Sequence, residues 1–200
     1  MRNSAKIALA ALLLSVSLPV QQAFANETYY TDQGHTEVRL GWSHAGVSMQ
    51  SAEFTKVKGK LSLEPDNVEQ STLSVTIDTA SISTSFGPLD DHLKSKDFLE
   101  VETYPQITFS STGVKKTGEK TADVTGDLTI HGVTKPVTLK TTLTHRGDHP
   151  LGAVIDYYKG KWVAFSATTE IDHVAFDVGG KFPTGPISIS IVTEMKDREK

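Results

Sequence analysis

The stretch VTGDLTIHGVTKPVTLKTTL, residues 124–143, decides the fold class of this protein. In both halves of the stretch the apolar residues are spaced by multiples of two, as at Leu128 and Ile130 or at Val137 and Leu139. That period is typical of a strand with one buried and one solvated face. The segment 130–136 between the halves predicts a hairpin turn, with Pro136 at the start of the second strand, where its missing N–H is tolerated.

Six further segments repeat the alternation, while helical periodicity is nearly absent. Gly and Pro fall mostly between the segments, which favours short links and antiparallel neighbours. The sequence therefore predicts an all-β protein whose eight antiparallel strands close into a barrel that can hold one small ligand. The apolar positions of the six segments are Val38/Leu40/Trp42, Val57/Leu61/Leu63, Leu73/Val75/Ile77, Ile107/Phe109, Val163/Phe165/Ala167/Ile171 and Ile187/Ile189/Ile191.

The segment 81–105 breaks this pattern. Leu89 and Leu93 are four residues apart and Phe98 follows, which predicts one or two helical turns within residues 89–99. Asp90 and Asp91 would lie near the start of that helix and favour its dipole. The pattern leaves two interpretations open, a helical lid across the mouth of the barrel and an ordinary connection packed on its end.

The first 25 residues are predicted to be a cleaved signal peptide. Arg2 and Lys6 precede an apolar run at 7–16, and Ala23-Phe24-Ala25 has the small-x-small pattern of a cleavage site. The apolar run is shorter than the roughly 20 residues of a membrane span. We therefore expect residues 26–200 to form one domain that is exported to the periplasm and does not span the membrane.

The composition of that domain limits its partners. Without Arg2 and Lys6, 18 basic and 24 acidic residues remain, a net charge of −6. This sign argues against nucleic acid as a partner. The chain has no cysteine, so stability in an oxidising compartment cannot come from disulfides. Transient contact with a membrane and a monomeric or dimeric state both remain compatible with the sequence.

No motif for catalysis is present, and we predict neither a catalytic residue nor a metal site. The closest pair of histidines, His145 and His149, lies in a turn-rich segment, so their spacing does not place both rings on one face. His35 and His44 flank the first alternating segment. They can be read as turn residues bonded to backbone or as a polar clamp at the mouth of the barrel.

Several unusual strings occur in one order along the chain, and together they resemble the YceI family of polyisoprenoid-binding, lipocalin-like periplasmic proteins. The most specific are the block from Asp91-His92-Leu93 to Phe98 and the block from Gly126 to Val137. The full set of strings is GHTEV (34–38), SHAGVS (43–48), Phe54 with Gly59, IDTASIST (77–84), DHLKSKDF (91–98), YPQITF (104–109) and GDLTIHGVTKPV (126–137).

The resemblance implies an eight-stranded barrel with a helical lid at its mouth. Its interior would take an isoprenoid tail, that of a polyprenyl lipid or an isoprenoid quinone, with the polar head near the open end. The protein would then sequester or transport this lipid in the periplasm without reacting with it. The candidate ligand-binding residues, with Leu93 and Phe98 closing the mouth, are Val38, Leu40, Trp42, His44, Leu73, Val75, Ile77, Asp91, His92, Leu93, Phe98, Phe109, Leu128, Leu139, Phe165, His173 and Ile189.

Two positions depart from the family pattern. Asp90 and His173 stand where family members often carry arginine. If those arginines hold an anionic head group, this chain is expected to prefer a neutral one such as a quinone.

Two other functions compete with that of a carrier. One is an enzyme or redox accessory that uses a prenyl-tailed cofactor, with His35, His44 and His92 moving protons at the mouth. The other is a stress-response protein whose barrel core is filled.

Overall fold

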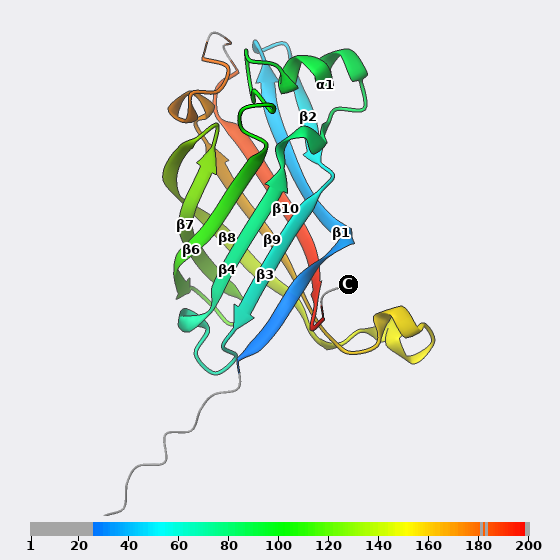
Figure 1. Ribbon diagram of the computed structural model, residues 1–200. Coiled ribbons are helices and arrows are strands. Elements are labelled where there is room, and N and C mark those ends of the chain that lie inside the picture. Colours follow the sequence, from blue (N-terminus) through cyan, green and yellow to red (C-terminus); the bar gives the residue numbers. More distant parts are fainter. Residues whose placement is uncertain (1–25, 181, 183, 199–200) are drawn as a thin grey trace, which may run out of the picture.

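The computed structural model describes residues 26–180, 182 and 184–198, and the predicted signal peptide lies outside the described residues. The strands close into an antiparallel barrel, in which β10 pairs with both β9 and β1 (Figure 1). The strands are β1 (Glu27–His44), β2 (Ser48–Phe54), β3 (Val57–Leu63), β4 (Thr72–Asp78), β5 (Ile82–Ser83), β6 (Gln106–Lys116), β7 (Thr121–Ile130), β8 (Val133–Asp148), β9 (Lys161–Ile171) and β10 (Ile187–Lys196).

The barrel wall has eight strand positions, because β2 and β3 lie one after the other beside β1 and share one position. The beginning of β1 pairs with β3 and its end pairs with β2. The two-residue β5 extends the sheet beside β2. The eight-stranded barrel predicted from the alternation is thus confirmed, and all eight predicted segments are strands. The sequence reading missed β2 and β5.

The hairpin between β7 and β8 corrects one detail of the prediction. Its turn consists of His131 and Gly132, both with positive φ (51° and 74°), as in the two-residue turns that suit hairpins. Pro136 therefore lies inside β8, opposite Asp127, and not at its start. The strand tolerates it because β8 pairs with β9 only from Lys140 onward.

The predicted helix is present as α1 (Gly87–Lys94), which starts two residues earlier than expected and ends well before residue 99. None of its side chains is buried. Asp90 lies in the first turn, and its carboxylate accepts hydrogen bonds from the backbone N–H and the hydroxyl of Thr84, both at 2.6 Å. These bonds lower the pKa of Asp90 and tie α1 to the loop before it.

The two ends of the barrel differ, and we name them by what they carry (Figure 1). The helix end carries α1 and the 3-10 turn η5 (His173–Phe176). The turn end carries the 117–120 turn between β6 and β7. Four further short 3-10 turns lie in the connections: η1 (Val68–Gln70), η2 (Thr79–Ser81), η3 (Pro150–Ala153) and η4 (Asp156–Tyr158). Within the described part of the chain, no helix has the length and apolar character to cross a bilayer.

Candidate ligand-binding channel

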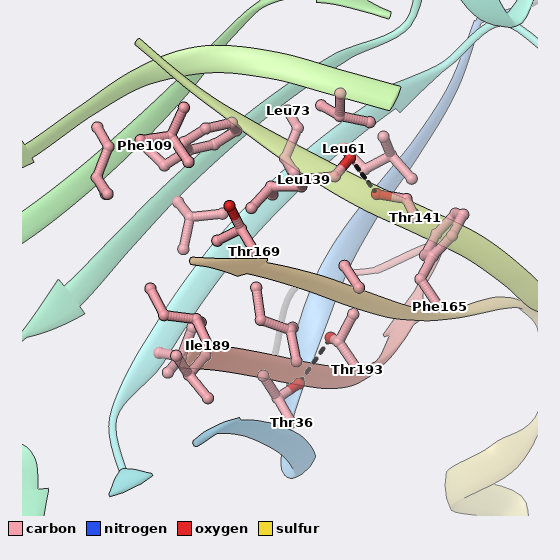
Figure 2. A pocket seen from close by; sticks show the side chains of 18 of the residues that line it. Thr36, Leu61, Leu73, Phe109, Leu139, Thr141, Phe165, Thr169, Ile189 and Thr193 are labelled. Atoms are coloured by element: carbon pink, nitrogen blue, oxygen red, sulfur yellow. Dashed lines mark hydrogen bonds between the residues drawn. The ribbon is translucent and has the colours of Figure 1, made fainter. Parts of the chain in front are cut away.

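A cavity of about 440 Å³ runs inside the barrel and is lined from every wall position. Figure 2 shows side chains such as Leu73, Phe109, Leu139, Phe165 and Ile189 pointing into it from different strands. They point inward because alternate residues of a strand lie on the same face. The volume lies within the roughly 300–1,000 Å³ of small-molecule sites.

The cavity is long. Its lining on β7 extends from Thr121 to Ile130, a strand length of about 30 Å. With the usual strand tilt this corresponds to roughly 20 Å along the barrel axis. The cavity is therefore elongated along the barrel axis, a shape that suits an extended chain better than a compact, globular ligand.

The middle of the barrel is lined but not filled. Leu73, Val75, Leu139 and Ile189 face the interior, yet each is only half-buried because no side chain from the opposite wall covers it. A filled core would bury these residues completely at close-packed density. The open channel therefore argues against the filled-core alternative.

The channel is closed at the helix end and open at the turn end. At the helix end its lining includes Leu99, Ile130, Ile171 and Phe176, all of which are buried. At the turn end the lining includes exposed charged residues, namely Lys116, Glu119, Lys120 and Arg146. The resemblance implied an opening beside the helix, and the structure places it at the opposite end.

Hydroxyl groups interrupt the apolar wall near β1 and β10. The Thr36 hydroxyl donates to the carbonyl of Asp32, and the hydroxyls of Thr36 and Thr193 are 2.8 Å apart (Figure 2). These contacts lie where the register between β1 and β10 shifts, between Thr31 and Thr36. Thr169 of β9 also lines the channel, nearer the helix end.

Most of the predicted ligand-binding residues line the channel, all through the inward face of their strands or, for His173, through η5. They are Val38, Leu40, Leu73, Val75, Ile77, Phe109, Leu128, Leu139, Phe165, His173 and Ile189.

The other six predicted residues lie outside the channel lining. Trp42, Leu93 and Phe98 pack against the core cluster at the helix end without reaching the cavity. His44, Asp91 and His92 are exposed on the rim of the same end. Leu93 and Phe98, which were expected to close the mouth, lie over the closed helix end, and the opening lies at the other end of the barrel.

The positions of Asp90 and His173 give no support to the expected preference for a neutral head group. Asp90 does not line the channel. His173 lies at the closed end, where its Nδ1 is 2.6 Å from the carbonyl oxygen of Val178 and its Nε2 is 2.7 Å from the hydroxyl of Thr184. Both ring nitrogens are thus used in holding the η5 segment. Neither position can select the head group of a ligand that enters from the turn end.

The redox alternative required three histidines at one mouth, and the structure separates them. His44 and His92 are on the helix end, whereas His35 lies on the outside of β1, with Nδ1 3.0 Å from Asp32. None of the three lines the channel. Among residues 26–180, 182 and 184–198, no group of three potential ligands is placed to hold a metal ion.

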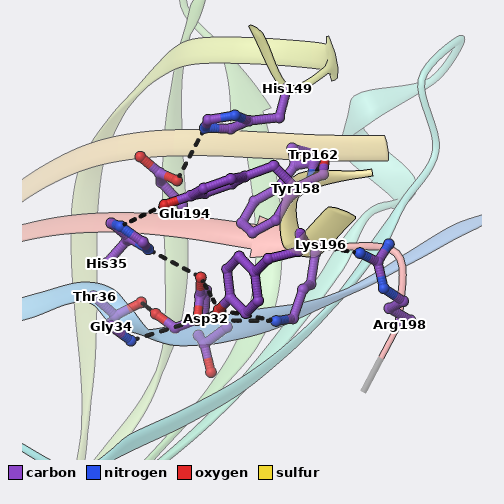
Figure 3. Close-up of polar contacts among 12 residues, drawn as sticks. Asp32, Gly34, His35, Thr36, His149, Tyr158, Trp162, Glu194, Lys196 and Arg198 are labelled. Carbon is purple, nitrogen blue, oxygen red and sulfur yellow. Dashed lines mark hydrogen bonds and ion pairs between the residues drawn. The ribbon is translucent and has the colours of Figure 1, made fainter. Parts of the chain in front are cut away.

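A buried polar cluster lies on the outer side of the barrel wall at the turn end (Figure 3). We call it the Asp32 clamp, comprising Asp32, His35, Tyr157 and Lys196. The Tyr157 hydroxyl is 2.6 Å from both carboxylate oxygens of Asp32, and Lys196 Nζ is 3.9 Å from Oδ1. Side chains of both Asp32 and Lys196 are only 4% exposed. The clamp joins β1, β10 and η4.

Charges inside the clamp stabilise each other. Burial raises the pKa of Asp32, but the hydrogen bonds from Tyr157 and His35 and the charge of Lys196 outweigh burial and leave it below its usual range. Burial and the hydrogen bond to Asp32 raise the pKa of Tyr157 to about 12. Lys196 Nζ also lies 4.4 Å from the centre of the Tyr157 ring. At neutral pH the clamp therefore contains an ionised carboxylate and a neutral phenol.

The sequence reading missed the turn-end residues of the site. Lys116 follows Val114 at an inward position of β6, but a register shift between Ser111 and Gly113 reverses the alternation that begins at Ile107. Thr36 and Thr193 are polar, so they give no apolar alternation that would mark them as inward-facing. A signal existed for Lys116, since Gly113 marks a site where a bulge is common.

Comparison with known proteins agrees with this architecture. The family model of the YceI-like domain matches residues 29–195. A UPF0312 protein of Pseudomonas savastanoi pv. phaseolicola is 40% identical over 181 residues, covering 90% of this chain and 91% of the relative. A UPF0312 protein of Ectopseudomonas mendocina is 41% identical over 174 residues, covering 86% of this chain and 87% of the relative.

Solved structures share the fold. BcnA of Burkholderia cenocepacia superposes with a TM-score of 0.72 at 24% identity, covering 82% of this chain and 98% of BcnA. The YCEI protein of Campylobacter jejuni has a TM-score of 0.66 at 25% identity, covering 74% and 85%. A polyisoprenoid binding domain from Saccharophagus degradans has a TM-score of 0.63 at 11% identity, covering 87% and 100%. The family match, the close relatives and the common barrel together show that this chain belongs to the YceI-like family.

Proposed function

We propose that this protein binds one long-chain isoprenoid lipid inside its barrel and sequesters or transports it in the periplasm without chemical reaction. The tail of a polyprenyl lipid or an isoprenoid quinone would lie along the channel and point toward the helix end. The polar head would lie at the turn end. The observation that carries this proposal is the elongated, apolar channel, closed at one end and open at the other.

Physical chemistry supports a hydrocarbon occupant. Removing one methylene from water contributes about 0.8 kcal/mol, so a tail that fills the channel gains affinity along its whole length. The elongated shape of the channel favours an extended chain over a compact, globular ligand. The binding of polyisoprenoid by the Saccharophagus degradans domain, which has the same fold, makes an isoprenoid the first candidate.

The turn end is suited to a polar head. Lys116 and Lys120 project from the end of β6 and the turn that follows it, and both border the opening. The backbone N–H of Leu143 donates to the carbonyl of Lys120, which fixes this turn against β8. A head group leaving the apolar tube would meet these ammonium groups and solvent.

The first test is native mass spectrometry of the protein purified from its own cells, followed by extraction and mass analysis of released lipid. We expect a single prenyl-tailed species at near-stoichiometric occupancy. A ligand-free mass that remains unchanged after incubation with added polyprenyl phosphate and quinone would refute the proposal.

A pair of variants ties the lipid to the channel. Thr169 points into the channel, whereas its neighbour Thr168 is exposed on the outer face of β9. Thr169→Phe should obstruct the bore and abolish lipid retention. Thr168→Phe introduces the same side chain on the other face and should retain lipid as the wild type does. Equal retention by both variants would place the lipid outside the barrel.

A further inference from the structure

The segment between β8 and β9 projects from the barrel at the turn end (Figure 1) and bears exposed apolar side chains. Leu151 is 43% exposed, Val154 79% and Ile155 44%. We call these three residues the apolar tip. The segment starts a few residues after Arg146, which borders the opening of the channel.

The apolar tip stands on a rigid base. The N–H of Gly152 donates to the carbonyl of His149, and the N–H of Ile155 to that of Leu151. In the same segment, Trp162 donates its indole N–H to the carbonyl of Tyr158, and the Tyr157 hydroxyl donates to Asp32 of the clamp. A loop that is free to fold back could cover its own apolar residues. This loop is held so that they face solvent.

From this arrangement we propose that the apolar tip inserts into the surface of a lipid bilayer and places the open end of the channel against it. The proposal rests on the proposed function, because an isoprenoid cargo is drawn from a bilayer. The tip has a fixed support, because the ring of Tyr158 lies 5.5 Å from that of the buried Trp162.

The size of the tip favours a bilayer over a protein partner. Three partly exposed side chains offer roughly 300 Å², well below the ~800 Å² that each partner contributes to a stable protein interface. A shallow anchor of this area gives reversible membrane binding, as a lipid carrier requires.

Charges around the tip are paired, so apolar contact must supply the affinity. Lys159 is 2.7 Å from Asp156, Lys161 is 2.9 Å from Asp148, and Arg146 is 2.8 Å from Glu27. Lys116 and Lys120 border the opening and add attraction for anionic lipid, so salt should weaken docking but not abolish it.

The test compares the triple variant Leu151→Ser, Val154→Ser, Ile155→Ser with a matched control at the helix end. The control is Val47→Ser, Met49→Ser, which removes two residues that are 82% and 71% exposed. Flotation with phosphatidylethanolamine–phosphatidylglycerol vesicles measures docking, and uptake of solanesol from those vesicles measures delivery. Loading of solanesol from detergent measures the channel alone, and urea unfolding checks that each variant is folded.

We expect the triple variant to float at least about tenfold less and to take up solanesol from vesicles about tenfold more slowly, with loading from detergent unchanged. The control should match the wild type in every assay. Wild-type flotation by the triple variant would overturn the proposal. So would loss of flotation in the control alone, or binding that depends on phosphatidylglycerol and vanishes in salt.

These outcomes separate the proposal from the proposed function. If no variant loads solanesol or a polyprenyl phosphate from detergent, the isoprenoid channel is refuted, while flotation still reports on the tip. If all variants load lipid and float equally, the channel stands and docking through the tip is refuted.

Discussion

The channel and the Asp32 clamp lie on opposite sides of the same stretch of wall and are built in opposite ways. The channel is apolar, half-packed and open, whereas the clamp is charged, buried and satisfied by short hydrogen bonds. β1 takes part in both, because Thr36 faces the channel and donates to the carbonyl of Asp32.

This contrast indicates how a barrel with an unfilled interior stays closed. Stability that close packing would give in the middle of the barrel is forgone. The clamp instead fastens β1 to β10 at the seam and is covered by the segment that carries η4. Further packing near the turn end comes from a small buried cluster of Tyr29, Leu61, Leu63, Val163 and Met195.

The largest effect should follow from breaking the clamp. Asp32→Ala removes the buried carboxylate that accepts hydrogen bonds from Tyr157 and faces Lys196, and we expect a loss of about 3–5 kcal/mol in the free energy of unfolding, measured in urea. Adding Lys196→Met should recover part of this loss. Asp148→Ala, which removes an exposed carboxylate from Lys161, is the control and should leave the urea midpoint in place. An equally small effect of Asp32→Ala would show that the clamp does not stabilise the seam.

An intermediate effect on stability is expected at Gly126 of β7, which leaves room for the ring of Phe109. A Cβ on Gly126 would lie 2.6 Å from the carbonyl oxygen of Ser110 and would also collide with the Phe109 ring. Gly126→Ala should therefore cost about 1–3 kcal/mol and displace Phe109. Urea unfolding and the NMR signals of Phe109 measure the two effects. Gly113→Ala, where the added Cβ meets nothing within 4 Å, is the control.

A smaller effect is expected in the channel itself. Leu139→Ala removes a side chain that is only half-packed, so the loss should be about 1 kcal/mol, below the usual 2–5 kcal/mol for a buried residue. Ile82→Ala, at a buried position outside the channel, should lie within the usual range. Similar losses for both variants would mean that the channel collapses or is filled in solution.

The smallest effect is the dependence of the clamp on pH. The folded protein lowers the pKa of Asp32, so its contribution is fully present above the unfolded pKa of about 3.9 and decreases as pH falls through the folded pKa. Between about pH 5 and pH 2, the wild type should lose stability more steeply than Asp32→Asn. Parallel curves for the two proteins would exclude an ionised, stabilised Asp32.

Sequence reasoning recovered the wall of the barrel well. Segments such as 73–77 and 187–191 alternate strictly, and side-chain direction in a strand follows from that period alone. β2 was missed because only Ala52 and Phe54 near its end are buried apolar residues, while Met49 is exposed.

The ends of the barrel and the clamp could not be read in the same way. Alternation identifies the inward face but contains no signal for which end stays open, since both ends have turns with apolar and charged residues. Asp32, Tyr157 and Lys196 are brought together only by barrel closure and the path of η4. Their residue types reveal a buried ion pair only once that geometry is known.

The seam between β1 and β10 also affects how the chain can reach its folded state. Tyr30 pairs with Lys196, so the first strand cannot complete its pairing until the last strand has formed. Contacts this distant in sequence close slowly. A chain that ends before Ile187 would expose the edges of β1 and β9, and exposed edges are the parts of a sheet that pair with other molecules. The ten residues of β10 thus determine whether the other strands stay monomeric or aggregate.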